Sequence, residues 1–206
     1  MIVNVIVGVL AYLIGAIPFS VILVKLLHKK DLINEGSGNA GALNSYEVSG
    51  NKLTGILVML LDALKGAFIV LINHYFFNNN FSFLLIASIW VVIGHNLSIF
   101  LKFKGGRGLA TAAGLFLLIN PYLLITWLIM WVAGYNIIKK NVHVASSIAL
   151  IGSSILAFST KDEMLAIFDF LHIGNYFSVK ILFTVIAIII LIKHIKPLQE
   201  LFKKEE

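Results

Sequence analysis

The strongest constraint on the fold of this chain is a series of long apolar segments that recurs from one end to the other. Hydrophobic residues make up 59% of its 206 residues and charged residues 13%, whereas soluble domains average about 45–50% and 25%. A bilayer-spanning helix needs about 20 mostly apolar residues. The pattern therefore predicts an all-α integral membrane protein with about seven transmembrane helices in a single domain, residues 1–206. The apolar segments are 2–24, 56–77, 83–101, 108–119, 122–138, 143–159 and 179–195.

The fourth apolar segment is short for a span, and Asn120-Pro121 separates it from the fifth. Proline removes a backbone donor and disfavours helical geometry in the residue before it. A five- or six-span fold, with residues 108–138 partly re-entrant, therefore remains open beside the seven-span prediction.

The basic residues indicate how the chain is oriented in the membrane. Thirteen Lys and Arg residues follow the first, third, fifth and seventh apolar segments, and two lie in the alternate loops. Cytoplasmic loops carry the excess of Lys and Arg, so we expect the N-terminus outside and the C-terminus in the cytoplasm. The net charge of +6 arises mainly from these predicted cytoplasmic segments, so we expect no nucleic acid as a partner. The thirteen are Lys25, Lys29, Lys30, Lys52, Lys102, Lys104, Arg107, Lys139, Lys140, Lys193, Lys196, Lys203 and Lys204, and the two are Lys161 and Lys180.

Two polar, glycine-rich loops fall on the predicted cytoplasmic side. The first spans residues 31–55 and contains Gly-Ser-Gly-Asn-Ala-Gly at 36–41, and the second spans residues 102–108 and ends in Lys-Gly-Gly-Arg-Gly at 104–108. Glycines let a backbone turn tightly and aim bare N–H groups at an anion, and the lysine and arginine add positive charge. We therefore expect a phosphate-bearing ligand where lipid meets water. For the first loop alone a plain connection is the alternative, because Gly, Ser and Asn are the usual turn residues.

Two ionisable residues, Asp62 and Lys65, lie three positions apart inside an apolar segment and so on one face of a helix. Each costs about 2.5–3.5 kcal/mol within a membrane, which is why such groups face a polar cavity or pair with each other. Both interpretations remain open: a self-neutralising structural pair, or part of a site between helices. Gly66 permits the close helix approach that a site would need.

Two histidines are candidate functional groups. His95, beside the second glycine loop, suits a general base, a ligand-binding group or a helix cap. His194 lies in the basic tail, whose alternative role is an anchor for anionic lipid. The other histidines, His74, His143 and His172, are scattered and, with His194, are expected on different faces or sides, so we predict no bound metal and no cofactor. The chain has no cysteine and no G-x-S-x-G elbow, so covalent catalysis is not expected.

Together these features resemble the acyl-phosphate:glycerol-3-phosphate acyltransferases of bacterial membranes, the PlsY family, over nearly the whole chain. Residues 37–44, Ser-Gly-Asn-Ala-Gly-Ala-Leu-Asn, look like the first motif of the family. Residues 62–66 match its helical Asp-x-x-Lys-Gly. Gly94-His95 and residues 100–111 are close to its second motif, which is long enough to be specific.

The resemblance implies transfer of a fatty acyl group from acyl phosphate to the 1-hydroxyl of glycerol 3-phosphate, the first step of phospholipid synthesis. The products are lysophosphatidic acid and inorganic phosphate. Acyl phosphate is already an activated mixed anhydride, so positioning and charge stabilisation supply most of the rate. The implied location is the bacterial plasma membrane, with the active site facing the cytoplasm and the acyl chain between helices. The implied partners are these two substrates and membrane lipid.

The resemblance also implies roles for particular residues. Ser37 would hydrogen-bond a substrate phosphate, and Lys104 and Arg107 would neutralise phosphate charge. The glycines of the second motif would bind glycerol 3-phosphate. The implied catalytic residues are Ser37, Lys104 and His194, and the implied substrate-binding residues are Gly38, Asn39, Asn44, Lys65, His95, Gly105, Gly106, Arg107 and Gly108.

Several positions depart from the family pattern. Glu47 stands where the family usually has an arginine, and Ile195 and Pro197 replace Arg and Asn in the third motif. These changes favour one alternative, a diverged non-catalytic paralogue that binds a phosphorylated lipid precursor. A small transporter of a phosphorylated solute is the other alternative, but the polar residues cluster on one side and do not line several spans. The milder departures are Leu43 for threonine, Ser98 for proline and Arg107 for lysine.

Overall fold

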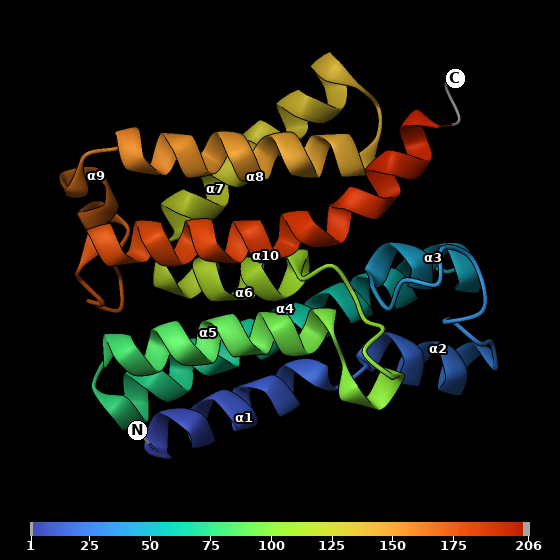
Figure 1. Cartoon of the computed structure of the whole chain (residues 1–206), viewed down its shortest axis with the longest axis horizontal. Helices are drawn as coiled ribbons and strands as arrows, with labels where there is room; N and C mark the ends of the chain where they lie inside the picture. The colour runs from blue at the N-terminus through green and yellow to red at the C-terminus, as the bar shows by residue number, and fades with distance from the viewer. Residues whose placement is uncertain (1, 204–206) are drawn as a thin grey trace. The chain divides into compact units, whose positions relative to one another are not determined.

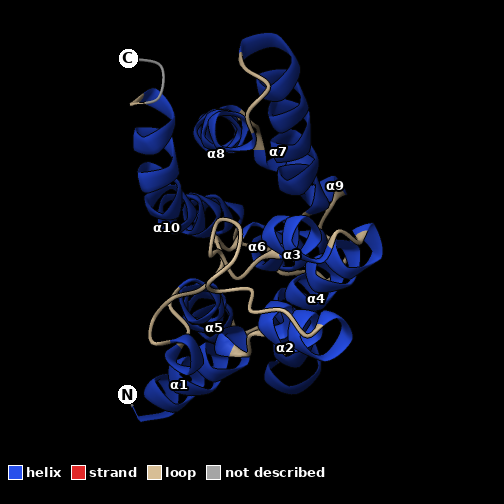
Figure 2. Cartoon of the chain, turned by 90° about the vertical axis from the view of Figure 1, so that its right-hand side faces the viewer, coloured by secondary structure: helices blue, strands red, loops and turns tan. Residues whose placement is uncertain are grey.

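The computed structural model describes residues 2–203. Met1 and residues 204–206, which include the predicted cytoplasmic Lys204, lie outside the described part of the chain. Within residues 2–203 every regular element is helical and no strand occurs (Figures 1 and 2). The prediction of an all-α fold is confirmed.

Each predicted apolar segment overlaps one or two of the observed helices. Within residues 2–203 six stretches are long and apolar enough to cross a membrane, α1 and α2 together forming one of them, whereas α6 has 11 residues. At 1.5 Å per residue α6 is about 16 Å long, roughly half of a ~30 Å hydrocarbon core. The number of crossings and the orientation of the termini remain predictions. The apolar helices are α1 (Ile2–Ala16), α2 (Phe19–His28), α4 (Lys52–Phe77), α5 (Phe81–Asn96), α6 (Leu109–Ile119), α7 (Pro121–Ala133), α8 (Val142–Ser159) and α10 (Tyr176–Phe202).

Asparagine side chains mark where four of these helices begin. Asn51 accepts hydrogen bonds from the backbone N–H groups of residues 53 and 54, and Asn141 does the same at the start of α8. Asn80 caps α5 and Asn175 caps α10 with one bond each. An asparagine at this position satisfies N–H groups that have no partner within the helix. Polar caps therefore set the ends of the apolar helices.

Two short helices interrupt segments that the sequence presents as loops. Helix α3 (Ala42–Ser49) occupies the centre of the first polar loop, residues 31–55, directly after the glycine run 36–41, and α9 (Asp162–Ile167) lies in the connection before α10. A 3₁₀ turn (Ile99–Leu101) follows α5 and a π-helical turn (Gly134–Ile138) follows α7. The first polar loop is thus more ordered than its glycines suggest.

The described chain forms two compact units, with the boundary between Leu115 and Phe116 within α6. A single domain over residues 1–206 remains a prediction. In the first unit α1 and α4 both pack against α5, as Figure 1 shows. The Tyr12 hydroxyl donates a 2.6 Å hydrogen bond to the Leu97 carbonyl, which ties α1 to the end of α5.

In the second unit α8 packs against both α7 and α10. The indole of Trp131 donates a 3.1 Å hydrogen bond to the Ser146 hydroxyl between α7 and α8. Lys180 on α10 forms a 2.7 Å ion pair with Asp162 at the start of α9. These contacts fix the helices of this unit through polar groups near their ends.

Candidate functional site

The break between α1 and α2 creates the first part of the site. Pro18 lies between the two helices and has no N–H, so carbonyl groups at the end of α1 need other donors. The ammonium of Lys65 donates to the carbonyls of Gly15 at 3.2 Å and Ile17 at 2.6 Å. The Ser98 hydroxyl donates to the Ala16 carbonyl at 2.6 Å. Lys65 of α4 and Ser98, which follows α5, therefore hold the break between α1 and α2 in place.

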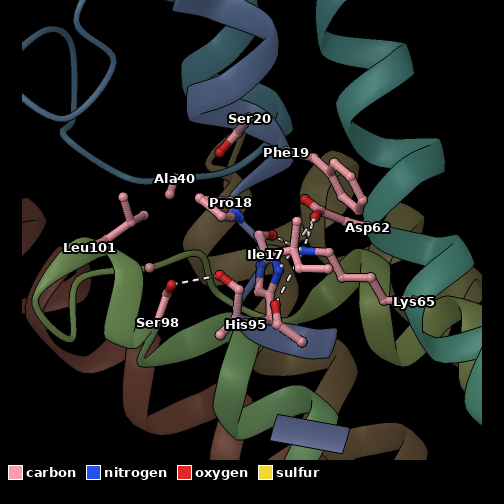
Figure 3. A pocket seen from close by; sticks show the side chains of 13 residues that line it. Ile17, Pro18, Phe19, Ser20, Ala40, Asp62, Lys65, His95, Ser98 and Leu101 are labelled. Atoms are coloured by element: carbon pink, nitrogen blue, oxygen red, sulfur yellow. Dashed lines mark hydrogen bonds and ion pairs between the residues drawn. The ribbon is translucent and has the colours of Figure 1, made fainter. Parts of the chain in front are cut away.

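The same lysine belongs to a buried charged cluster. Oδ1 of Asp62 lies 2.8 Å from Lys65 Nζ and 3.5 Å from His95 Nδ1. The relative exposures of Asp62, Lys65 and His95 are 2%, 4% and 6%. Figure 3 shows Asp62 and Lys65 reaching from α4 toward His95 of α5. The two carbonyls and the carboxylate match the three N–H bonds of the ammonium, so Lys65 and Asp62 neutralise each other as one of the two sequence-based interpretations requires.

A small pocket surrounds this cluster. Its volume is about 10 Å³, roughly enough for one water molecule. Backbone from the helix break and from both glycine loops completes the wall. The lining residues are Gly15, Ala16, Ile17, Pro18, Phe19, Ser20, Ala40, Asp62, Lys65, His95, Ser98, Leu101 and Gly105.

The first glycine loop, residues 36–41, is organised by one asparagine side chain. Oδ1 of Asn44 accepts a 2.8 Å hydrogen bond from the backbone N–H of Ser37. Its Nδ2 donates to the carbonyls of Leu32 at 3.0 Å and Glu35 at 3.3 Å. Asn44 is buried, whereas Ser37 is exposed. The loop therefore presents the serine hydroxyl outward from a fixed backbone.

The second glycine loop, residues 104–108, is organised by backbone contacts and by His95. The N–H of Gly106 donates to the His95 carbonyl at 3.0 Å, and the Gly105 carbonyl accepts from the N–H of Ala40 at 3.3 Å. This second bond joins the two glycine loops. A Cβ on Gly106 would overlap Nε2 of His95, so the imidazole needs a glycine at this position.

The positive charges of the site have different surroundings. Lys104 is exposed, and Arg107 is half-buried. Burial lowers the pKa of the Arg107 guanidinium from its usual value, and the negative charge of Glu47 acts in the opposite direction. An arginine remains charged at neutral pH even so. The site thus keeps a cation at Arg107, with an exposed acidic residue of α3 acting on it.

Most of the site residues inferred from the sequence come together in the first unit. The loop of Ser37, Gly38 and Asn39 is hydrogen-bonded to the loop that holds Gly105, Gly106, Arg107 and Gly108. Lys65 and His95 line the small pocket that both loops border. Asn44 holds the first loop through its buried amide. Gly108 has a φ of 88°, a left-handed conformation that glycine adopts without strain.

His194 belongs to the second unit. Its ring is buried, and its Nδ1 lies 3.0 Å from the Ile190 carbonyl. The His143 ring packs edge-on against it, with 5.5 Å between ring centroids. The expectation that these two histidines lie on different faces or sides was wrong. They are about 50 positions apart in the chain, but α8 and α10 pack against each other and bring the two rings together. Among the residues the structure describes, no group of three metal-ligating side chains gathers, and the absence of a metal remains a prediction.

Sequence reasoning missed two polar residues beside the second motif. The side chains of Asn96 and Thr111 are buried, and their polar atoms have no hydrogen-bond partner among the described residues. Buried polar groups normally have partners, so these two are candidates for contact with water or a ligand. Their positions were the signal available in the sequence, because Asn96 directly follows His95 and Thr111 is the last residue of the second motif.

The backbone conformation of Ser98 explains why a serine can stand where the family usually has a proline. Ser98 has a φ of −67°, which is close to the value that a proline ring imposes. Its hydroxyl adds the hydrogen bond to Ala16. This departure from the family pattern therefore keeps the local geometry.

These features define a class: an integral membrane protein with two joined glycine loops, flanking cations and a buried Asp–Lys–His cluster. The model of the family described as glycerol-3-phosphate acyltransferase matches residues 5–204. A glycerol-3-phosphate acyltransferase of Anaplasma phagocytophilum (strain HZ) is 35% identical, over 95% of this chain and 94% of the relative. The enzyme so named from Staphylococcus haemolyticus (strain JCSC1435) is 36% identical, over 96% of this chain and 94% of its own.

Solved structures agree with these sequence matches. The crystal structure of PlsY (YgiH), an integral membrane glycerol 3-phosphate acyltransferase, in its glycerol 3-phosphate form has a TM-score of 0.78 and 29% identity. The match covers 98% of this chain and 94% of that one. The lysophosphatidic acid form has a TM-score of 0.76 and 28% identity. This chain belongs to the glycerol-3-phosphate acyltransferase family.

Proposed function

We propose that this protein transfers a fatty acyl group from acyl phosphate to the 1-hydroxyl of glycerol 3-phosphate, and releases lysophosphatidic acid and inorganic phosphate. The observation that carries the proposal is the hydrogen bond between Ala40 and Gly105, which joins the two glycine loops into one backbone surface. Both substrates carry phosphate, and backbone N–H groups with nearby cations suit phosphate oxygens. The proposed location is the bacterial plasma membrane, with this surface facing the cytoplasm.

The chemistry asks little of the protein beyond positioning. The substrate hydroxyl attacks the acyl carbon, the new ester bond forms, the bond from that carbon to the phosphate oxygen breaks, and the hydroxyl proton leaves with the released phosphate. Ser37, Lys104 and Arg107 are proposed to bind the phosphates and to stabilise the charge that develops on them. No nucleophile from the protein is needed, because phosphate is a good leaving group.

His194 is the proposed catalytic residue of the second unit. A carbonyl oxygen only accepts hydrogen bonds, so the 3.0 Å contact with Ile190 makes Nδ1 the donor. We propose that His194 takes part in catalysis, as its match to the third motif of the family implies.

The acyl chain is proposed to lie in an apolar groove of the first unit. The groove runs along α1 and α5 and has a volume of about 780 Å³, within the usual range for ligand sites. Phe103, at one end of the groove, directly precedes the second glycine loop, which suits a lipid with a phosphorylated head. The lining residues are Asn4, Val5, Gly8, Val9, Tyr12, Ile86, Trp90, Ile93, Leu97, Ile99 and Phe103.

Acyl transfer by the purified, detergent-solubilised protein tests the proposal. Labelled glycerol 3-phosphate is offered with palmitoyl phosphate and, separately, with palmitoyl-coenzyme A. We expect lysophosphatidic acid from the phosphate donor only. Product from the thioester alone would overturn the proposed donor.

One observation favours a second candidate, a paralogue that binds a phosphorylated lipid precursor without turnover. The Glu47 carboxylate acts on Arg107, the arginine proposed to bind phosphate. Binding of glycerol 3-phosphate by a folded protein that makes no product from either donor would establish this candidate.

A further inference from the structure

The buried Asp62–Lys65–His95 cluster has no task in the chemistry proposed above. Three ionisable groups inside apolar helices are costly, and replacing a buried ion pair by apolar groups is often neutral or stabilising. Asp62 lies at the centre of the cluster and contacts both of the others. Its retention in a membrane helix asks for a reason beyond stability.

The geometry of His95 supplies such a reason. On one side its Nδ1 faces the Asp62 carboxylate at 3.5 Å. On the other side its Nε2 packs against the backbone of Gly106, at the place where a Cβ would stand. The carbonyl of the same histidine accepts the Gly106 N–H. One residue therefore contacts Gly106 twice, through its ring and through its backbone.

Lys65 serves the other side of the cluster. Its ammonium bonds the carbonyls of Gly15 and Ile17 at the break between α1 and α2. Asp62 is thus the shared acceptor between a lysine that holds the helix break and a histidine that supports the second glycine loop. Figure 3 shows Asp62, Lys65 and His95 beside Ile17 and Pro18 of the helix break.

We propose that Asp62 is a positioning residue that acts through His95 to hold Gly106 where its loop binds the phosphate of glycerol 3-phosphate. The inference rests on the proposed function for the identity of that ligand. It also gives Lys65 and His95 a supporting role beneath the loop in place of direct contact with substrate. The carboxylate orients the imidazole, and the imidazole sets the position of the glycine backbone.

Paired variants separate this role from simple charge neutralisation. Asp62→Asn alone leaves Lys65 buried without its counter-ion. Its kinetics are therefore read beside those of the double variant Asp62→Asn/Lys65→Met, which removes both charges at nearly constant volume. We expect the double variant to fold and the KM for glycerol 3-phosphate to rise at least about tenfold, because small displacements of a binding group are costly. The KM for palmitoyl phosphate should stay within about twofold. A folded double variant with wild-type KM for glycerol 3-phosphate would reduce the cluster to a structural ion pair.

A coupling measurement tests whether Asp62 acts through the histidine. Asp62→Asn/Lys65→Met is repeated in a His95→Ala background, where the proposal predicts no further rise in KM. Independent, additive effects would contradict it. Asp162→Asn is the matched control, because it alters the ion pair with Lys180 in the second unit and leaves an amide oxygen as acceptor. Its KM should equal that of the parent.

Calorimetric binding of glycerol 3-phosphate separates failure of this inference from failure of the proposed function. If the parent binds the ligand but makes no product, and the double variant binds at least about tenfold more weakly, the positioning role stands without the reaction. If the parent makes lysophosphatidic acid and the folded double variant binds equally well, the reaction stands and the positioning role is overturned. A parent that neither binds nor turns over glycerol 3-phosphate would overturn both.

Discussion

The two glycine loops look alike in sequence but are held in place by different means. Residues 36–41 depend on one side chain, the buried amide of Asn44, which bonds three backbone groups. Residues 104–108 depend on backbone hydrogen bonds and on the imidazole of His95, which packs against Gly106. A glycine-rich loop therefore becomes a defined surface only through the groups that support it, and each loop should fail in its own way.

Loss of the cation in the second loop should have the largest effect. Arg107→Ala should lower kcat/KM for glycerol 3-phosphate by about 10- to 100-fold, because a hydrogen bond to a charged group contributes about 1.5–3 kcal/mol. Arg107→Lys is the matched control, since it keeps the charge but loses the fork geometry. Its kcat/KM should lie between that of the parent and that of Arg107→Ala. Steady-state kinetics measures both variants. Equal values for the alanine variant and the parent would remove Arg107 from the binding surface.

Loss of the supporting amide should damage the first loop chiefly through stability. Asn44→Ala removes three hydrogen bonds in a buried environment, and at about 1 kcal/mol each the free energy of unfolding should fall by about 2–3 kcal/mol. Thermal unfolding in detergent measures the change. Ser49→Ala in the same helix removes only exposed contacts and should change stability by less than about 0.5 kcal/mol. Equal losses for the two variants would show that Asn44 does not organise the loop.

The charge of Glu47 sharpens the comparison, because this residue follows the first loop but acts on a cation of the second. Glu47→Arg should lower the KM for glycerol 3-phosphate by about fivefold, the scale of a reversed surface charge of about 1 kcal/mol. Glu47→Gln should give a smaller change in the same direction. No gain, or a loss, would mean that Glu47 is an accepted part of the site and would remove the main support for a non-catalytic paralogue.

The smallest effect should come from Ser98→Pro, which restores the residue usual in the family. The φ of −67° already suits proline, so only the hydrogen bond to the Ala16 carbonyl is lost. The free energy of unfolding should change by about 1 kcal/mol or less, as chemical denaturation in detergent would measure. A loss of several kcal/mol would show that the helix break depends on that bond.

The sequence predicted the helices well because the membrane imposes a long apolar pattern that local composition reveals. It also predicted both glycine loops on the same side of the membrane from the distribution of the basic residues, and the hydrogen bond between Ala40 and Gly105 joins them in the structure. It did not reveal α3, because residues 42–49 lie in a polar, glycine-rich stretch and the helix is seen only where it packs against α4 and α2. The contact of His143 with His194 and the placement of His95 against Gly106 are tertiary facts, with no local signal to mark them.

The roles of Lys65 and Asp62 illustrate the same limit. Their spacing placed them on one helix face, but it left open whether they pair or line a site. The structure shows that they pair, and that Lys65 also bonds the carbonyls of Gly15 and Ile17, which lie about 50 positions earlier in the chain. Only the packing of α4 against the helix break brings these groups together.

The most direct test of the account is the kinetics of Gly106→Ala, measured with both substrates varied. A Cβ at this position would overlap the His95 ring and stand 2.9 Å from the Ala40 carbonyl oxygen, so the loop, the ring or both must shift. Gly152→Ala in the second unit is the control, because its Cβ would stand 3.4 Å from the nearest atom, Met130 Sδ, an ordinary contact. The account predicts that the KM for glycerol 3-phosphate rises at least about tenfold in Gly106→Ala while the KM for palmitoyl phosphate stays near that of the parent. Unchanged KM values for both substrates in the folded variant would contradict the central claim that this loop binds glycerol 3-phosphate.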